Sequence, residues 1–551
     1  MLNQYKLNIC YENEGKLYAS SNAKTGHYVI DIIEKENSLS FHLNNSVKMD
    51  NIKFVLEFPY FFNEKEVVFC NGYQSWTDSR EFNKNDIMPN QNSFARNTNF
   101  IHHSNNVGDY NFTNYTNKKG LYHSWSYGYM RLDNNVKLFG SLKEKTGFTV
   151  IYFDYENNKI YIEKDLEGLT LRDKSEYDLM DLFYTEGEYN EVFDAYFKAL
   201  GTNTPRSKRK VGYTSWYNYY QNISEDIITR DLEAISNIGT KLDIFQIDDG
   251  YQTAVGDWLS IDGTKFPNGM KAVVDKIHAK DMMAGLWLAP FGAQRGSKIA
   301  KNHKDWLIKD DKGYPIVSGI NWGGFYSLDF YNNDARAYIK EVFDTVFNDW
   351  GFDMVKLDFL YGVCVAPRNN KTRGEIMCDA VDFIRECCGL KQILGCGVPL
   401  FPTFGKFDFC RTGCDVGLSW EKPKYFSTLN REGVSAMNSV INTIYRRHLD
   451  GRAFVNDPDV FLLRDSNIKM TLDQRKLLAK INKLFGSVLF VSDNVAEYND
   501  EQKNIYLDTI KASDIKVNSV SQDGNIITID YVEDGVANTL KFDVTNGTEI
   551  K

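Results

Sequence analysis

The segment Asp353-Met354-Val355-Lys356-Leu357-Asp358 places a lysine and an aspartate two residues apart inside an apolar run. Such a run is typical of a buried strand. Because side chains two residues apart point to the same face of a strand, Lys356 and Asp358 are predicted to share a face. A buried carboxylate beside a cation is held ionised and oriented, as a catalytic nucleophile requires. A structural ion pair inside a barrel explains the same two residues equally well.

Polar and aromatic residues recur where other predicted strands end. In chain order they are Trp216, Tyr217, Asp248, Asp249, Trp287, Cys396, Arg411 and Asp415. A single aspartate in such a place is commonly the N-cap of the next helix. Carboxylates, tryptophan, lysine and arginine gathered at several strand ends are harder to explain as caps. Two separated carboxylates with an aromatic wall indicate a glycosidase, in which one attacks the anomeric carbon and the other handles the proton.

The elements that would position these residues are strands alternating with amphipathic helices, beginning near residue 211. We expect strands near 211–216, 242–248, 283–289, 325–329, 353–359, 392–396, 407–412 and 486–492. This rhythm fits a (β/α)₈ TIM barrel, whose active site lies at the C-terminal ends of the strands. No GxGxxG or GxxxxGK[ST] motif follows the first strand, which excludes dinucleotide-binding and P-loop folds.

The rest of the chain is predicted to be β-rich. Residues 1–190 show short alternating runs between Asn, Gly and Lys turns, which predicts an all-β sandwich. Residues 191–210 form a junction, residues 211–496 the catalytic barrel, and residues 497–551 a small C-terminal antiparallel β domain. Within the sandwich, Trp76 lies in a glycine-flanked loop, as either a buried plug or a ring-stacking contact.

The composition of the chain argues against several classes of protein. The 74 acidic and 64 basic residues give a net charge of -10, which argues against a nucleic-acid partner. We expect no membrane span, because no apolar run approaches the necessary length, and no signal peptide, because the N-terminus has no basic region followed by an apolar one. Nine cysteines without a CxxC pair indicate a reducing, cytoplasmic location. The eight scattered histidines offer no metal-ligand spacing, so neither a metal nor another cofactor is expected.

The chain resembles the short-form α-galactosidases of glycoside hydrolase family 36. Eight motifs carry the resemblance in order, and they are Ser215-Trp216-Tyr217-Asn218-Tyr219-Tyr220, Phe245-Gln246-Ile247-Asp248-Asp249, Gly256-Asp257-Trp258, Trp287-Leu288-Ala289-Pro290-Phe291, Lys356-Leu357-Asp358-Phe359-Leu360, Leu394-Gly395-Cys396-Gly397, Arg411-Thr412-Gly413-Cys414-Asp415 and Asn456-Asp457-Pro458-Asp459. The N-terminal match depends mainly on Gln74-Ser75-Trp76.

The resemblance implies a role for each matching residue. Asp358 would be the nucleophile of a retaining mechanism and Asp415 the acid/base, with Asp408 a weaker candidate for the acid inside an apolar run. The substrate-binding residues would be Trp76, Trp216, Tyr217, Asp248, Asp249, Trp287, Lys356, Cys396 and Arg411. Asp248 and Asp249 would hold the O4 and O6 hydroxyls, Lys356 and Arg411 the O3 and O2 side, with Cys396 near O2.

The implied activity is hydrolysis of terminal α-galactosyl residues from small oligosaccharides through a covalent galactosyl-enzyme. An α-N-acetylgalactosaminidase with the same mechanism is an alternative, and it would need more room beside O2. A transglycosylase differs only in the group that accepts the sugar. A catalytically silent galactoside-binding protein on the same fold is the alternative from another class.

Overall fold

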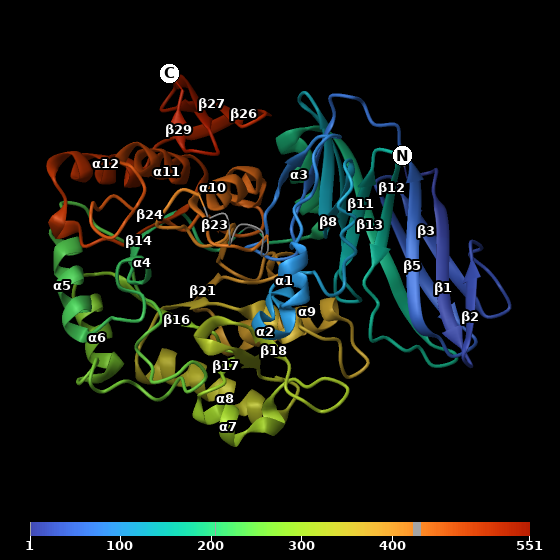
Figure 1. The fold of residues 1–551 in the computed structure, drawn as a ribbon, viewed down its shortest axis with the longest axis horizontal. Helices are drawn as coiled ribbons and strands as arrows, with labels where there is room; N and C mark the ends of the chain where they lie inside the picture. The colour runs from blue at the N-terminus through green and yellow to red at the C-terminus, as the bar shows by residue number, and fades with distance from the viewer. Residues whose placement is uncertain (1, 204, 422–430, 551) are drawn as a thin grey trace.

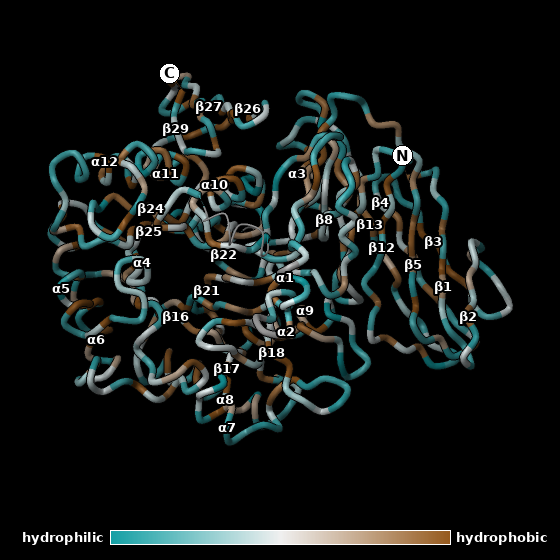
Figure 2. The backbone as a smooth tube through the Cα atoms, in the orientation of Figure 1, coloured by the Kyte–Doolittle hydropathy of each residue, from teal (hydrophilic) through white to brown (hydrophobic). Residues whose placement is uncertain are grey.

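The computed structural model describes residues 2–203, 205–421 and 431–550, which form three consecutive regions (Figure 1). Two antiparallel sheets come first, on the right of the view, and a parallel sheet surrounded by helices follows. A small antiparallel sheet ends the chain near the C-terminus. Hydrophobic segments run through the strands, while the peripheral loops are mostly hydrophilic (Figure 2).

The N-terminal region is a sandwich of two antiparallel sheets. The first has the order β2 (Lys16–Ser20), β1 (Lys6–Asn13), β5 (Asp50–Pro59), β12 (Lys159–Lys164), β11 (Thr149–Asp154), β8 (Leu121–Trp125). The second has the order β3 (Tyr28–Lys35), β4 (Ser38–Asn45), β13 (Glu176–Glu188), β10 (Asn135–Ser141), β9 (Tyr127–Leu132), β6 (Val67–Cys70), β7 (Arg80–Phe82). Alternating residues such as Ile9 and Leu56 of one sheet and Phe41 and Phe139 of the other share one core.

The parallel sheet closes into a barrel. Its order is β23 (Val455–Asp457), β22 (Phe409–Arg411), β21 (Gln392–Gly395), β20 (Met354–Leu357), β16 (Met283–Leu288), β15 (Ile244–Ile247), β14 (Lys210–Thr214), β25 (Val488–Val491), β24 (Val460–Phe461). The two ends of this order, β23 and β24, are separated in the chain only by Pro458 and Asp459. The Ser487 N–H also donates to the Asn456 carbonyl at 3.0 Å, which joins β23 to the start of β25.

Counted as one interrupted strand, β23 and β24 complete eight barrel strands within the described residues. The predicted fold class is confirmed: an N-terminal all-β sandwich, a (β/α)₈ barrel and a small C-terminal antiparallel sheet. One strand assignment was wrong, because 325–329 is not part of the barrel. There β19 (Phe325–Ser327) pairs instead with β17 (Gly292–Gln294) and β18 (Val317–Gly319) in a separate antiparallel sheet.

Eight helices of ten or more residues occur in the described chain. They are α3 (Tyr189–Leu200), α5 (Glu225–Ser236), α6 (Gly269–His278), α8 (Asn333–Asp344), α9 (Arg373–Cys388), α10 (Ala436–Tyr445), α11 (Leu472–Phe485) and α12 (Asp500–Ile510). Side chains cap several of them: Ser224 accepts from the Ile227 N–H, and Thr471 forms a capping box with Gln474. Shorter helices are α1 (Ser93–Asn97), α2 (Asn99–His102), α4 (Trp216–Tyr219) and α7 (Lys298–Asn302).

The C-terminal sheet consists of β26 (Ile515–Asp523), β27 (Ile526–Glu533), β28 (Val536–Asp543) and β29 (Thr548–Glu549). Helix α12 precedes this sheet and follows the last barrel strand, so it completes the final strand–helix repeat. We propose that residues 1–190, 211–496 and 497–551 are the three domains, with a junction at 191–210. The boundary between the last two domains falls before α12. No helix in the described ranges is both long and apolar enough to cross a bilayer.

Arg446, at the end of α10, joins the sandwich to the barrel. Its buried guanidinium donates five hydrogen bonds, to the carbonyls of Gly72, Gln74, Ser75 and Thr412 and to the side-chain oxygen of Asn71. Burial lowers the pKa of Arg446 to about 10, which leaves it charged at neutral pH. One cation of the barrel therefore contacts four residues of the loop that carries Trp76.

We expect Arg446→Met to lower the stability of the protein by about 3 kcal/mol or more, because each buried acceptor left without a donor costs about 1–3 kcal/mol. Differential scanning calorimetry would show the change as a lower Tm. The exposed Arg172 provides the matched control, and Arg172→Met should change stability by less than about 0.5 kcal/mol. An unchanged Tm for Arg446→Met would contradict the assigned role.

Candidate active site

A cavity of about 280 Å³ lies at the C-terminal ends of the barrel strands. Eight of the eleven predicted site residues line it, namely Trp76, Trp216, Asp248, Asp249, Trp287, Lys356, Asp358 and Asp415. They come from the ends of different barrel strands and from a loop of the sandwich, so residues up to 339 positions apart (415 − 76) meet in one place. Trp76 reaches the cavity of its own chain.

Asp358 follows β20 and is held by two donors. The Trp287 indole N–H donates to Oδ2 at 3.0 Å, and the Phe359 backbone N–H donates to Oδ1 at 2.9 Å. Phe359 has a left-handed backbone with φ of 54°, which is uncommon for a bulky residue. Burial raises the pKa of Asp358, with Lys356 opposing the shift and Asp415 adding to it. This carboxylate is therefore poorly solvated, oriented and aimed into the cavity.

Lys356 directs its ammonium to Asp248 on another strand. The Nζ–Oδ2 distance is 2.9 Å, and both side chains are buried. Gln246 also donates to Asp248 Oδ2 at 2.9 Å. Burial disfavours the charged lysine, but Asp248, Cys396 and Asp358 together outweigh this effect and raise the pKa of Lys356. The ion pair considered for Lys356 and Asp358 is thus formed between Lys356 and Asp248.

Asp249 lies beside Asp248 with both oxygens engaged. Gln221 Nε2 and the Trp322 indole N–H donate to Oδ2 at 2.8 Å and 2.9 Å, and Gln252 Nε2 donates to Oδ1 at 2.6 Å. Burial raises the pKa of Asp249, while these hydrogen bonds oppose the shift. A carboxylate can accept about four hydrogen bonds, so Asp249 retains capacity for a ligand hydroxyl.

Asp415 lies in a more open environment than Asp358. Its side chain is 33% exposed, and its Oδ1 accepts from Arg411 Nη2 at 3.0 Å. The same Nη2 lies 2.9 Å from Asp459 Oδ2. The cavity therefore presents one buried and one partly solvated carboxylate, and glycoside hydrolysis requires two carboxyl groups that differ in protonation state.

Asp459 shares the Arg411 guanidinium with Asp415. Its Oδ2 also accepts from the Val416 N–H at 2.7 Å and from the Tyr217 hydroxyl. Burial raises the pKa of Asp459 to about 7, against the opposing effect of Arg411.

Three predicted residues lie behind the cavity wall. Tyr217, Cys396 and Arg411 are buried, and the residues lining the cavity do not include them. Trp216 and Tyr217 begin α4, and successive helical residues point about 100° apart, so only Trp216 faces the cavity. Asp408 lies away from the cavity lining as well, where it accepts from Arg206 and Arg385.

Trp76 forms the wall contributed by the sandwich. Its indole N–H donates to Cys396 Sγ at 3.3 Å, and its ring packs edge-on against Phe359 with centroids 5.0 Å apart. Gly397 permits this approach, because a Cβ there would lie 2.8 Å from Trp76 Cζ2. The sequence left Trp76 as either a buried plug or a ring-stacking contact. In the structure, the tryptophan packs against buried Phe359 and also lines the cavity.

Trp322 and Glu432 are among the lining residues that were not predicted. Trp322 contacts Asp249 and has a positive φ of 56°, and its position between Asn321 and two glycines is the signal that was available. Glu432 is 5% exposed and accepts from Thr77 and Tyr110. Burial raises the pKa of Glu432. Nothing in its sequence neighbourhood distinguishes this glutamate from a surface residue.

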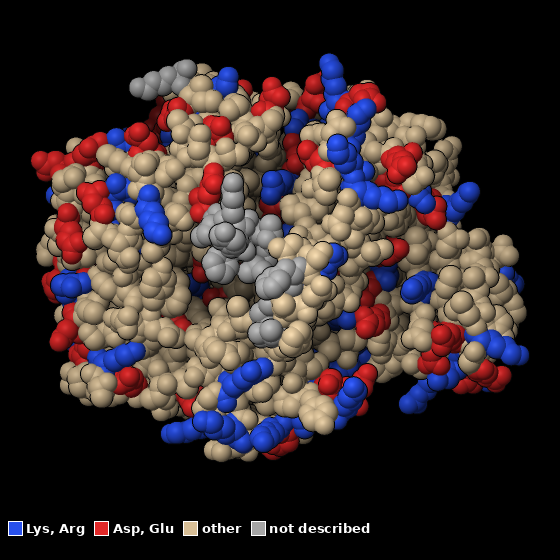
Figure 3. All heavy atoms as spheres, viewed as in Figure 1, with Lys and Arg blue, Asp and Glu red and all other residues tan. Residues whose placement is uncertain are grey.

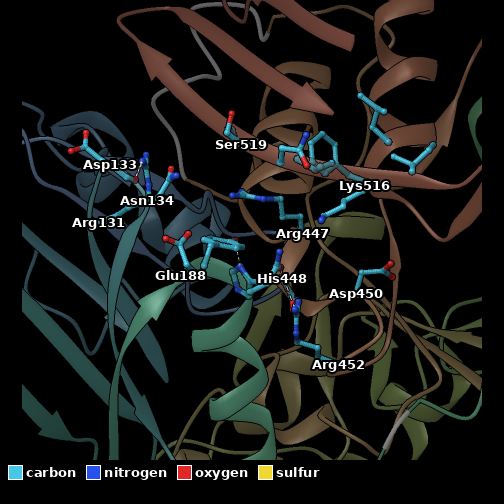
Figure 4. Close-up of a pocket in the computed structure, with 18 residues that line it drawn as sticks. Arg131, Asp133, Asn134, Glu188, Arg447, His448, Asp450, Arg452, Lys516 and Ser519 are labelled. Carbon is cyan, nitrogen blue, oxygen red and sulfur yellow. Dashed lines mark hydrogen bonds between the residues drawn. The ribbon is translucent and has the colours of Figure 1, made fainter. Parts of the chain in front are cut away.

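A second cavity, of about 310 Å³, lies between the sandwich, the barrel and the C-terminal sheet (Figure 4). Its cations are largely engaged by the protein: Arg131 pairs with Glu81, and Arg452 with Asp194. The described residues lining it include none of the predicted site residues. On the face shown in Figure 3, acidic and basic side chains are interspersed. The cavity at the strand ends is therefore the candidate active site.

The described residues contain no group of three or more His, Cys, Asp or Glu side chains arranged to hold a metal ion.

Comparison with known proteins identifies relatives of the barrel. Residues 186–387 match the family model described as melibiase. Over 277 residues the chain is 23% identical to α-galactosidase 1 of Pediococcus pentosaceus, covering 46% of this chain and 36% of that protein. Over 181 residues it is 29% identical to the A type blood α-D-galactosamine galactosaminidase of Flavonifractor plautii, covering 31% of this chain and 16% of that protein. The alignments thus span about a third or less of these relatives.

The fold is shared over almost the whole chain. The α-galactosidase of Thermus thermophilus, solved with p-nitrophenyl α-D-galactopyranoside, gives a TM-score of 0.72 at 22% identity, covering 93% of this chain and 98% of that chain. Together these findings confirm the predicted resemblance to the α-galactosidases of glycoside hydrolase family 36.

We expect Asp358→Asn to be more stable than the wild type at pH 7, by about 0.5–2 kcal/mol, as is common when a strained active-site group is removed. Because burial raises the pKa of Asp358, the folded state binds this proton more tightly than the unfolded state does. The wild type therefore loses stability as pH rises above the ordinary aspartate pKa of about 3.9, and the asparagine variant is spared that loss. Thermal unfolding between pH 4 and 8 measures the difference.

The matched control is Asp408→Asn, since Asp408 is also buried but is paired with Arg206 and Arg385. It should be less stable than the wild type at pH 7. An Asp358→Asn protein that melts below the wild type at pH 7 would contradict the expectation.

Proposed function

We propose that the protein is a retaining exo-α-galactosidase that removes terminal non-reducing α-D-galactosyl residues from oligosaccharides. The observation that carries the proposal is the pairing of a buried, donor-held Asp358 with a partly exposed Asp415 on one cavity. A cavity of about 280 Å³ suits a terminal sugar better than the interior of a chain.

In the first step, Asp358 attacks the anomeric carbon and forms an ester to the sugar. The bond from that carbon to the glycosidic oxygen breaks, and its electron pair goes to the departing oxygen. That oxygen takes the proton from Asp415, which becomes ionised. The indole N–H of Trp287 holds the attacking carboxylate in position.

In the second step, Asp415 removes a proton from water as the water oxygen attacks the anomeric carbon. The bond to Asp358 breaks, and its electron pair returns to that carboxylate. The products are galactose with its α-configuration retained and an enzyme in its starting protonation state. A sugar hydroxyl in place of water would give transglycosylation.

The polar end of the cavity would bind the hydroxyls of galactose. We assign Asp248 and Asp249 to the O4 and O6 hydroxyls, because ionised carboxylates make strong, directional hydrogen bonds. Lys356 would donate to O3. Trp287 and Trp76 provide the aromatic walls, with Trp216 less central, and Arg411 and Cys396 support the O2 side from behind. Tyr217 acts through Asp459 and not by touching the sugar.

The alternative activity is that of an α-N-acetylgalactosaminidase, which the name of the Flavonifractor relative brings into consideration. Such an enzyme needs space for an acetamido group beside O2. The indole of Trp76 covers Cys396, so the wall in this region is an aromatic ring, which favours galactose. A silent galactoside-binding protein would not need two carboxylates in different environments.

A reducing, cytoplasmic location is part of the proposal. None of the nine cysteines, all of which lie in the described residues, forms a disulfide, and seven of them are buried.

Three p-nitrophenyl substrates distinguish these activities when assayed side by side: the α-galactoside, the α-N-acetylgalactosaminide and the α-glucoside. We expect turnover of the α-galactoside and a loss of at least about 10³-fold in kcat for Asp358→Ala, because the step that forms the ester is lost. A slow substrate should also trap a covalent adduct on Asp358, detectable by peptide mass spectrometry. Binding of these substrates without turnover would refute the proposed enzymatic activity. Wild-type turnover by Asp358→Ala would refute the assignment of Asp358 as the nucleophile.

We expect Asp248→Asn to lower kcat/KM for the α-galactoside by about 10²–10⁴-fold, because it weakens the contact to the sugar and leaves the Lys356 ammonium without its partner. The ratio of galactoside to glucoside turnover should fall as well. Asp281→Asn is the control, since the Asp281 side chain is 85% exposed. Equal selectivity in the two variants would remove Asp248 from sugar recognition.

A further inference from the structure

Arg411 is shared between two carboxylates. Its Nη2 lies 3.0 Å from Asp415 Oδ1 and 2.9 Å from Asp459 Oδ2, while its Nε lies 4.0 Å from Asp457 Oδ2. One cation therefore faces three carboxylates. The guanidinium is 1% exposed, so solvent does little to screen these interactions.

Asp459 is held firmly in this arrangement. It follows Pro458 in the interruption between β23 and β24, with φ of 77°. Its Oδ2 accepts from the Val416 N–H and the Tyr217 hydroxyl as well as from Arg411. Val416 is the residue after Asp415, so Asp459 contacts both the backbone beside the proton donor and the cation that pairs with it.

We propose that Asp459 is a positioning residue for the proton donor: by sharing the Nη2 group of Arg411, it leaves Asp415 incompletely ion-paired and able to carry its proton. The inference rests on the acid/base role proposed above for Asp415. A proton donor must be protonated before the first step and ionised after it. A guanidinium paired with Asp415 alone would favour the ionised form throughout.

The groups that act on Asp415 come from several elements, and they are Arg411, Asp358, Asp457, Asp459, Cys396, Tyr217 and Tyr220. Arg411 is the cation of this set, and it favours the ionised carboxylate. The ionised aspartates oppose it. Among them Asp459 competes for the same nitrogen, so its charge most directly offsets the guanidinium at Asp415.

The electrostatic coupling is reciprocal. Burial raises the pKa of Asp459 to about 7, and the neighbouring Asp415 and Asp457 carboxylates add to the shift. The same repulsion acts on Asp415, where the charge of an ionised Asp459 offsets that of the Arg411 guanidinium. The influence of Asp459 is greatest above neutral pH, where a proton donor would otherwise lose its proton.

The test is Asp459→Asn, which keeps an oxygen that can accept from Val416 and Tyr217 but removes the charge. We expect the basic limb of the kcat/KM profile for methyl α-galactoside to move by about one unit to lower pH, the size typical of a lost like charge. The p-nitrophenyl α-galactoside should be affected much less, since its leaving group needs little protonation.

Asp457→Asn is the matched control, because Asp457 lies on the same interrupted strand but faces the guanidinium from 4.0 Å. It should move the basic limb less than Asp459→Asn does. An unmoved limb in Asp459→Asn, or equal losses on both substrates at every pH, would overturn the proposal in favour of a purely structural role.

A readout without substrate separates this inference from the proposed activity. The pH dependence of Tm is measured for the wild type and Asp459→Asn, each with and without Asp415→Asn. The contribution of Asp415 to that dependence should lie at lower pH in the Asp459→Asn background. If the wild type hydrolyses no α-galactoside, the activity is refuted, and this thermodynamic cycle still decides whether Asp459 controls the proton of Asp415.

Discussion

The buried ion pair between Lys356 and Asp248 determines how the other charges of the cavity are arranged. It spans 2.9 Å between β20 and the end of β15, strands that are separated by β16 in the barrel. Removing two charges from water is costly unless their remaining hydrogen-bonding capacity is satisfied. Gln246 and Thr214 supply donors to the same carboxylate, so three strands support one charge pair. Because Lys356 is engaged there, Asp358 lies near a cation without being bound by it.

The cavity and the shell behind it hold more negative than positive side chains. The cations are Lys356 and Arg411, and the carboxylates are Asp248, Asp249, Asp358, Asp415, Glu432, Asp457 and Asp459. A positive charge that develops on a bound molecule would be stabilised there. Cleavage of a glycosidic bond passes through an oxocarbenium-like state, which carries such a charge. The arrangement is therefore suited to that state more than to the neutral sugar.

Local periodicity predicted much of the fold and part of the site. The two-residue spacing of Lys356 and Asp358 put both on one face, and both line the cavity. The ion-pair partner of Lys356 lies 108 residues earlier, a distance at which no local pattern carries information. The seventh barrel strand was missed because Pro458 and Asp459 split it into runs too short to recognise. Glu432 was missed because its burial comes from Thr77 and Tyr110, which belong to another region of the chain.

The loop that carries Trp76 has a consequence for the order in which the molecule is completed. A ribosome makes this loop more than 300 residues before it makes Cys396, its hydrogen-bond partner, and 371 residues before Arg446 reaches the Ser75 carbonyl. Domains generally fold as units during synthesis, so the sandwich can form while this loop still lacks its partners. The aromatic wall is then completed only after the barrel has been synthesised and has folded. A chain interrupted before α10 would have its sandwich but no finished pocket.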